Sequence, residues 1–214
     1  MRLVKNKSAM LLAGLACMLI SVAANSSPID LTRAASDGWM HGHQTVSITP
    51  GGNVYAGEFK FGVVSGNDDF ETGSTLGLFC IDVTTSLNNN ASYTVVGASG
   101  HLSAVTFGKV AWLYDNHYEN ANSAIKSAAF QLALWTIVNG VTVNSAPHAV
   151  ISAMTTMLSG LGSISNSALY DIFVFTPQSG QVLIGVKPVP EPGSLMLLGL
   201  GVLGAGAVRR IRKH

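Results

Sequence analysis

Charged residues are scarce in this 214-residue chain, where 12 Lys and Arg and 11 Asp and Glu amount to 11% of the sequence. The few basic residues are also separated, since three lie in the first seven positions and four in the last six. A nucleic-acid-binding surface needs clustered Lys and Arg to neutralise phosphates, so this pattern excludes that class. Disorder is excluded as well, because 48% of the residues are hydrophobic and the net charge is only +1.

The motifs of several enzyme classes are missing too. The sequence contains no phosphate-binding loop, no dinucleotide fingerprint and no serine-hydrolase elbow. His41 and His43 could bind a metal from one strand face, but two ligands do not make a site. The acidic segment 65–71 lacks the ligand order of an EF-hand, so we interpret it as a polar turn. We therefore expect no catalytic residue, no metal and no cofactor.

The N-terminus has the three parts of a secretory signal peptide. Basic residues in the first seven positions are followed by a 14-residue apolar run, Ala9–Val22, and by small residues that allow cleavage after Ala24. A membrane-spanning helix needs about 20 apolar residues, which favours cleavage over a permanent anchor. Residues 1–24 are therefore predicted to be a signal peptide.

The C-terminus joins a proline break to an apolar segment and a basic end. The break is Pro190-Glu191-Pro192, the apolar segment covers 195–208, and the basic residues are Arg209, Arg210, Arg212 and Lys213. Such a segment is marginal for crossing a bilayer, and the cations should hold the tail on the cytoplasmic side. Residues 188–214 therefore predict a short transmembrane helix, with an exported passenger, 25–187, on the other side.

This tail resembles the PEP-CTERM sorting signal, with Pro190, Glu191 and Pro192 in the position of the family's Pro-Glu-Pro. The resemblance implies a Gram-negative bacterium, a precursor in the inner membrane and an exosortase-type protease that cuts near this motif. It also implies a destination at the cell surface or in the extracellular exopolysaccharide matrix. It does not indicate what the passenger does.

Two kinds of periodicity divide the passenger. Segments rich in Val, Ile, Phe, Tyr and Thr predict strands at 44–49, 54–64, 75–84 and 92–97. Helices are predicted at 101–114, 123–138 and 147–158, and a final hairpin at 171–176 and 181–187. This order predicts a mainly β, α+β domain, built as an antiparallel β-sandwich or barrel with a helical insert.

Two residues of the passenger need an explanation. Cys80 is its only cysteine, and an unpaired exported thiol must be buried, bonded between chains or used chemically. Gln131 is the one polar side chain in segment 128–135, which is typical of a buried helix. A buried carboxamide without partners costs about 1–3 kcal/mol. Gln131 must therefore bond to nearby backbone or have a chemical partner.

The segments Phe79-Cys80 and Gln131-Leu132-Ala133-Leu134-Trp135 resemble the thioester domain of bacterial surface adhesins. That family combines an aromatic-Cys segment in a strand with a downstream helix that carries Gln-x-Ala-aliphatic-Trp. Residues 110–114 resemble the short helix that precedes the Gln motif.

The thioester resemblance implies a specific chemistry. The Cys80 sulfur would attack the Gln131 side-chain carbonyl, expel ammonia and leave an internal thioester, which then transfers the acyl group to a surface amine such as lysine. Phe79, Phe130 and Trp135 would shield the bond, and Asp82 or Tyr114 would assist proton transfer. This is a single-use acyl donor, and we do not expect an enzyme.

Two other interpretations stay open from the sequence. A passive, exopolysaccharide-associated β protein would simply bury Cys80 as a small hydrophobic residue. A cysteine hydrolase would need a base beside Cys80, but its candidate histidines fit no known signature and are interpreted as surface residues: His101, His117 and His148. The target of any thioester and the oligomeric state are not determined by the sequence.

Overall fold

A computed structural model of the chain describes residues 28–33, 38–161 and 167–189. The predicted signal peptide, the Pro-Glu-Pro segment, the C-terminal helix and its basic end lie outside these residues. No helix within the described part is long and apolar enough to span a membrane.

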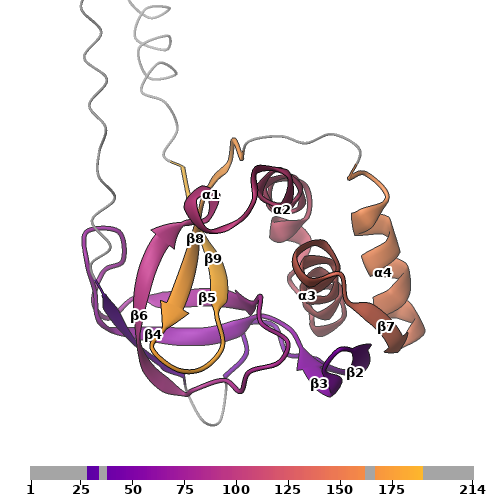
Figure 1. Ribbon diagram of the computed structural model, residues 1–214, viewed down its shortest axis with the longest axis horizontal. Coiled ribbons are helices and arrows are strands. Elements are labelled where there is room, and N and C mark those ends of the chain that lie inside the picture. Colours follow the sequence, from indigo (N-terminus) through magenta and orange to yellow (C-terminus); the bar gives the residue numbers. More distant parts are fainter. Residues whose placement is uncertain (1–27, 34–37, 162–166, 190–214) are drawn as a thin grey trace, which may run out of the picture.

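Six antiparallel strands form a closed barrel (Figure 1). Around the barrel their order is β1 (Ile29–Arg33), β4 (Phe59–Ser65), β5 (Thr75–Cys80), β9 (Leu183–Pro188), β8 (Tyr170–Pro177) and β6 (Asn90–Gly97). Phe59, Phe61 and Val63 of β4 are buried in alternation with less buried residues, as a sheet with one face on a core requires. The prediction of a mainly β domain is confirmed in its barrel form.

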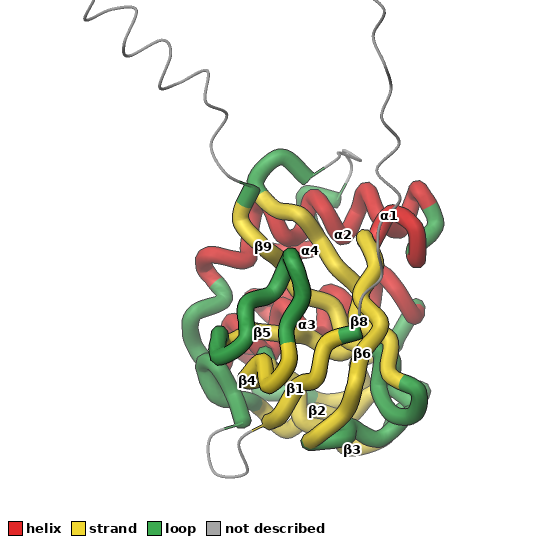
Figure 2. Tube along the Cα trace, turned by 90° about the vertical axis from the view of Figure 1, so that its left-hand side faces the viewer, coloured by secondary structure: helices red, strands yellow, loops and turns green. Residues whose placement is uncertain are grey.

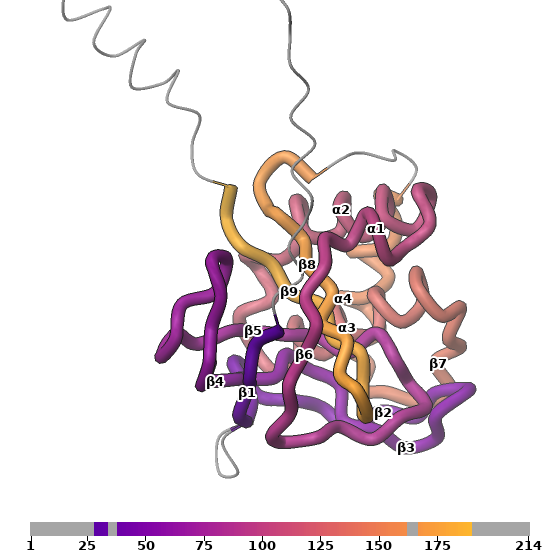
Figure 3. Tube along the Cα trace, turned by 60° about the vertical axis from the view of Figure 1, so that its left-hand side comes forward, coloured from indigo at the N-terminus to yellow at the C-terminus, as the bar shows by residue number. Residues whose placement is uncertain are grey.

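The strands that close the barrel come from distant parts of the chain. Figure 3 shows the last hairpin, β8 and β9, lying between strands of the first half of the sequence. There β9 pairs with β5, and β8 pairs with β6. Gly185 in β9 permits this approach, because a Cβ at that position would collide with the Leu78 side chain of β5.

In the described part of the chain, α2, α3 and α4 form a layer on one side of the barrel, which Figure 2 shows behind the strands, and the short α1 lies against the ends of β6 and β8. The helices are α1 (Ala98–His101), α2 (Ala104–His117), α3 (Ala124–Asn139) and α4 (His148–Leu158), with a 3₁₀ turn at Tyr118–Asn120. A small sheet of β3 (Gly52–Ala56), β2 (Gln44–Thr49) and β7 (Thr142–Ser145) lies beside them. In Figure 1, α3 lies between the barrel and α4.

The ends of α3 follow from its sequence. The Ser123 hydroxyl accepts the backbone N–H of Lys126 and so caps the first turn. Gly140 ends the helix with a φ of 65°, a left-handed conformation that glycine adopts without steric cost. All residues from Ser127 to Trp135 are buried, so the prediction of a buried helix is confirmed.

Several predicted boundaries are wrong. Segment 54–64 is not one strand, since β3 ends at Ala56 and β4 begins at Phe59. The predicted strand 75–84 ends at Cys80, where the chain turns. The predicted helix 101–114 is interrupted, because Ser103 caps a new helix after α1. The short strands β1 and β7 were not predicted, since few of their residues are apolar and their pairing partners are remote.

Candidate functional site

Two remote segments place Cys80 and Gln131 against each other. Cys80 is the last residue of β5, and Gln131 lies in the middle of α3, which packs on the barrel wall. Only 1% of each residue's surface is exposed. The two predicted site residues, 51 positions apart in the sequence, thus meet in the core.

A pair of hydrogen bonds joins the Gln131 carboxamide to the main chain of Cys80. The Cys80 N–H donates to Gln131 Oε1 at 3.0 Å, and Gln131 Nε2 donates to the Cys80 carbonyl oxygen at 2.7 Å. Together they hold the plane of the amide and satisfy its need for partners in the core. The backbone bonds expected for a buried glutamine are therefore made to the cysteine itself.

The Cys80 thiol has its own hydrogen bonds at the turn that follows β5. Its Sγ donates to the Asp82 carbonyl oxygen at 2.7 Å and accepts the Asp82 N–H at 3.3 Å. Burial raises the pKa of the thiol to about 12, although the bond to the Asp82 backbone and the indole of Trp135 lower it in part. At neutral pH the sulfur is therefore protonated.

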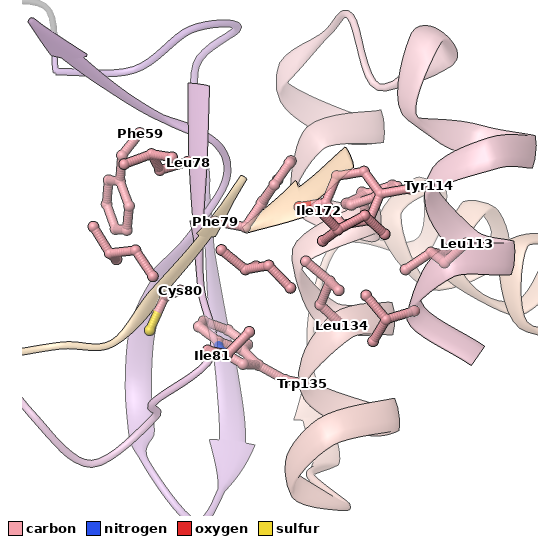
Figure 4. Packing of buried hydrophobic residues seen from close by; sticks show 14 of the residues in the cluster. Phe59, Leu78, Phe79, Cys80, Ile81, Leu113, Tyr114, Leu134, Trp135 and Ile172 are labelled. Atoms are coloured by element: carbon pink, nitrogen blue, oxygen red, sulfur yellow. The ribbon is translucent and has the colours of Figure 1, made fainter. Parts of the chain in front are cut away.

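Aromatic rings enclose the strand end from the helical side. The Phe79 ring lies 4.8 Å from that of Phe130, and the Tyr114 ring lies 5.1 Å from Phe130. Figure 4 shows Phe79 between β5 and the helices, while the Cys80 sulfur points away from them. This alternation follows from the strand itself, because successive side chains point to opposite faces.

The two residues proposed to assist proton transfer differ in their position. Asp82 touches the thiol through its main chain, whereas its carboxylate accepts the N–H and the hydroxyl of Thr84, both at 3.0 Å. Tyr114 is buried among Phe130 and Tyr118, and its hydroxyl has no hydrogen-bond partner in the described part.

The alternative nucleophile–base pairing has no support from the positions of the histidines. His101 and His148 are exposed, as predicted, but His117 is half-buried against Trp112 and was wrongly assigned to the surface. Within the described residues no group of three or more His, Cys, Asp and Glu side chains is arranged to hold a metal ion.

A buried acid beside the site was not predicted from the sequence. Glu58 is 1% exposed, accepts the Tyr118 hydroxyl at 2.8 Å and lies 3.6 Å from His41 Nε2. Its backbone N–H donates to the Ser127 hydroxyl at 2.8 Å, one helical turn before Gln131 on α3. Burial raises the pKa of Glu58 to about 7, against the lowering effect of the Tyr118 bond.

No pattern in the sequence indicates this burial. Read as one strand, segment 54–64 places Glu58 on the same face as Lys60, which a barrel normally turns to solvent. Here Ser127 of α3 and Tyr118 contact Glu58, and Gly77 on β5 leaves room, since a Cβ there would collide with the Glu58 carboxylate. Among the described residues the buried polar side chains are Glu58, Ser127 and Gln131.

A pocket of about 380 Å³ opens beside Cys80. Trp135 forms part of its wall together with Cys80, while Arg33, Trp39 and Tyr55 line it from the β1, β3 and β4 side. The thiol thus borders a cavity on its own side of the strand, while the rings of Phe79 and Phe130 pack on the opposite, helical side.

Comparison with known proteins identifies the tail of the chain. The family described as the PEP-CTERM protein-sorting motif matches residues 188–213. The predicted sorting signal is thereby confirmed, and it supports an exported, surface-directed protein. No curated protein matches the sequence.

Solved structures with a similar fold are distant in sequence. The N-terminal thioester domain of a Clostridium perfringens surface protein has a TM-score of 0.44 and 12% identity, over 62% of this chain and 89% of that one. The N-terminal domain of the Streptococcus pyogenes pilus tip adhesin Cpa has a TM-score of 0.46 and 10% identity, over 74% and 98%. The thioester domain of the Staphylococcus aureus TIE protein has a TM-score of 0.44 and 12% identity, over 75% and 78%.

Proposed function

We propose that this protein is an adhesin-like surface protein that attaches covalently to its target through a Cys80–Gln131 thioester. The observation that carries the proposal is the pair of hydrogen bonds that fixes the Gln131 amide on the Cys80 main chain. The sorting motif at 188–213 supports the export that such a role requires and implies processing by an exosortase-type protease.

The Cys80 N–H is the group that would activate the carbonyl. It already donates to Gln131 Oε1, the oxygen on which negative charge develops when a nucleophile adds to the amide carbon. The thiol would leave the Asp82 carbonyl by rotation about the Cα–Cβ bond of Cys80 and add to that carbon. An S–C bond then forms, the C–N bond breaks, and the thiol proton leaves with the nitrogen as ammonia.

The resulting acyl bond would be protected by its surroundings. Both partners are 1% exposed, so water has little access to the acyl carbon. Attack by a nucleophilic group of the target breaks the C–S bond and joins the Gln131 acyl group to the target. Because the pKa of Cys80 is about 12, the released sulfur takes up the proton of the nucleophile. Each chain can do this once, since the amide is consumed.

A second candidate function is a passive matrix protein with a buried, inert Cys80. The raised pKa of the thiol favours it, because a protonated buried thiol is unreactive. The two candidates differ in mass, since only the thioester has lost ammonia.

The deciding experiment is intact mass spectrometry of the full chain purified in detergent. The thioester form is lighter by one ammonia than the sequence requires, and Cys80→Ala and Gln131→Ala should each abolish this deficit. Asn139→Ala is the matched control, because Asn139 is a carboxamide on the same helix that donates to the neighbouring Ile81 carbonyl at 3.2 Å. This variant should retain the deficit, whereas full mass in the unmodified protein would overturn the proposal.

A further inference from the structure

The pocket beside Cys80 contains a buried donor and a buried acceptor that are not fully satisfied. Trp135 Nε1 has only the weak thiol acceptor of Cys80 near it, and Gln181 Oε1 has no hydrogen-bond partner among the described residues. Both side chains line the pocket. Trp135 is only 3% exposed. A hydroxyl group both donates and accepts, so it can satisfy the two together, whereas an ammonium group can satisfy only the acceptor.

One wall of the pocket carries two aromatic rings, Trp39 and Tyr55, each packed against the ring of His43. Trp39 and His43 stack with centroids 4.5 Å apart, and the edge of Tyr55 follows at 4.8 Å. Tyr55 is 60% exposed, so much of its ring is accessible to a ligand. A flat ring of this kind suits a ligand that offers an apolar face with polar groups at its rim.

The charge of the pocket distinguishes between classes of ligand. Arg33 is the charged residue that lines it, with its guanidinium 5.0 Å from the Trp39 ring centroid and 5.1 Å from that of Phe59. Two of its five N–H groups donate to Gly38 and Asn89, which leaves others for a ligand. No Asp or Glu lines the pocket in the described part of the chain. A carboxylate is therefore attracted, and a lysine ammonium is repelled.

We propose that this pocket binds an acidic saccharide, a sugar unit that carries a carboxylate. The carboxylate pairs with Arg33, the ring lies on Trp39 and Tyr55, and a hydroxyl reaches Trp135 and Gln181 beside Cys80. Binding itself does not need the thioester.

The second part of this inference rests on the proposed function. A hydroxyl of the bound sugar attacks the Gln131 acyl carbon, so that an O–C bond forms and the C–S bond breaks. The hydroxyl proton passes to the Cys80 sulfur, and the product is an ester between the protein and the saccharide. The acceptor of the acyl group is then a sugar hydroxyl instead of a lysine amine.

Binding is tested with the full-length Cys80→Ala protein, which cannot form a thioester, by calorimetric titration with trigalacturonate. Its methyl-esterified form and Nα-acetyl-lysine amide serve as the uncharged and the cationic probes. We expect trigalacturonate to bind at least about tenfold more tightly than either probe, as one lost charged contact predicts. Equal or tighter binding of the lysine probe would overturn the proposal.

Variants locate the binding in the pocket. Arg33→Gln should weaken trigalacturonate at least about tenfold and leave the esterified probe unchanged, while Tyr55→Ala should weaken both. Lys126→Gln removes an exposed cation outside the pocket and should change neither, with the unfolding temperature of each variant measured as a check on folding. Unchanged affinity in Arg33→Gln would refute the assignment of the carboxylate.

The thioester proposal and the saccharide-binding proposal can be refuted independently of each other. An ammonia deficit in the unmodified chain without saccharide binding refutes the pocket assignment and leaves the thioester in place. Saccharide binding by Cys80→Ala, together with full mass of the unmodified chain, supports the pocket and refutes the acyl transfer. Incubation of the unmodified chain with trigalacturonate tests the ester directly, because its mass should rise by one whole trisaccharide.

Discussion

At the scale of single residues, Cys80 has two separate roles: its main chain positions Gln131, and its sulfur is the proposed nucleophile. Its N–H and carbonyl both bond to the Gln131 amide, so substitution of the side chain alone leaves these two contacts available. Cys80→Ala therefore separates the chemistry of the thiol from the position of Gln131. For this reason it is the preferred background for binding experiments.

Glu58 makes stability depend on pH. Its pKa is raised to about 7, so the folded protein holds this proton more tightly than the unfolded chain, whose carboxyl ionises near the usual 4.5. The contribution of Glu58 to the free energy of unfolding is therefore largest below pH 4.5. It declines as the pH rises to about 7 and is constant above that pH. We expect unfolding free energies of the unmodified protein to fall by about 3 kcal/mol over this range, relative to Glu58→Gln.

Chemical denaturation at several pH values measures this slope. The groups that face Glu58 are Tyr118, Tyr114 and His41. Glu119→Gln is the matched control, because Glu119 is an exposed acid that also accepts a tyrosine hydroxyl, that of Tyr170. Glu119→Gln should retain the fall of the unfolding free energy with pH. If Glu58→Gln showed the same fall as the unmodified protein, the pH dependence could not be assigned to Glu58.

Alkylation tests whether the free Cys80 thiol is buried and protonated. In Gln131→Ala the sulfur is free, yet with a pKa of about 12 only about one part in 10⁴ is thiolate at pH 8. We expect iodoacetamide to modify it at least about a hundredfold more slowly than in urea-unfolded protein. Similar rates in both states, followed by mass spectrometry, would show that the thiol is accessible and ionised.

At the scale of elements, α3 supplies side chains that contact Glu58 and Cys80 at the candidate site. It carries Ser127 and Gln131 on one face, since residues four apart lie above each other on a helix. Ser127 accepts from Glu58 of the barrel wall, and Gln131 bonds to Cys80 at the end of β5. The helix is thus attached to two neighbouring segments of the sheet.

The N-terminal cap of α3 should contribute to stability without contributing to the chemistry. Ser123→Ala removes the bond to the Lys126 N–H and should cost about 1 kcal/mol in chemical denaturation. Ser103→Ala, which uncaps α2 in the same way, should cost a similar amount. Both variants should retain the ammonia deficit, and its loss in Ser123→Ala alone would show that the first turn holds Gln131 in place.

At the scale of the whole molecule, the interface between the helix layer and the barrel protects the acyl carbon from water. Phe130 of α3 contacts Phe79 of β5 across this interface, with ring centroids 4.8 Å apart. Its packing determines how tightly the helix closes on the strand end, so the lifetime of a thioester depends on residues that take no part in forming it.

Phe130→Leu should therefore lower stability by about 1–2 kcal/mol and speed hydrolysis of the thioester. Intact mass followed over time measures hydrolysis as the gain of one water. Phe70→Leu is the matched control, because Phe70 is also buried but packs on Phe173 and Phe175. It should lose similar stability without faster hydrolysis, and equal hydrolysis rates in the two variants would contradict the role of the interface.

Local signals in the sequence were sufficient for a large part of the fold. Strand β2 has the predicted bounds, and α3 begins and ends within one residue of the predicted helix 123–138, because caps and turn residues act over a few positions. The same holds for the final hairpin and the sorting motif. The sequence also identified Cys80 and Gln131 as residues in need of an explanation.

Only the tertiary structure decided what those residues contact. The closure of the barrel, the burial of Glu58 and the pocket lined by Arg33 and Trp135 all bring together segments that are far apart in the chain. Periodicity shows which face of a strand is apolar, but not which helix will cover it. That depends on long-range packing, and here Tyr118 of the 3₁₀ turn and Ser127 of α3 enclose Glu58, at a position that the alternation of segment 54–64 alone assigns to solvent.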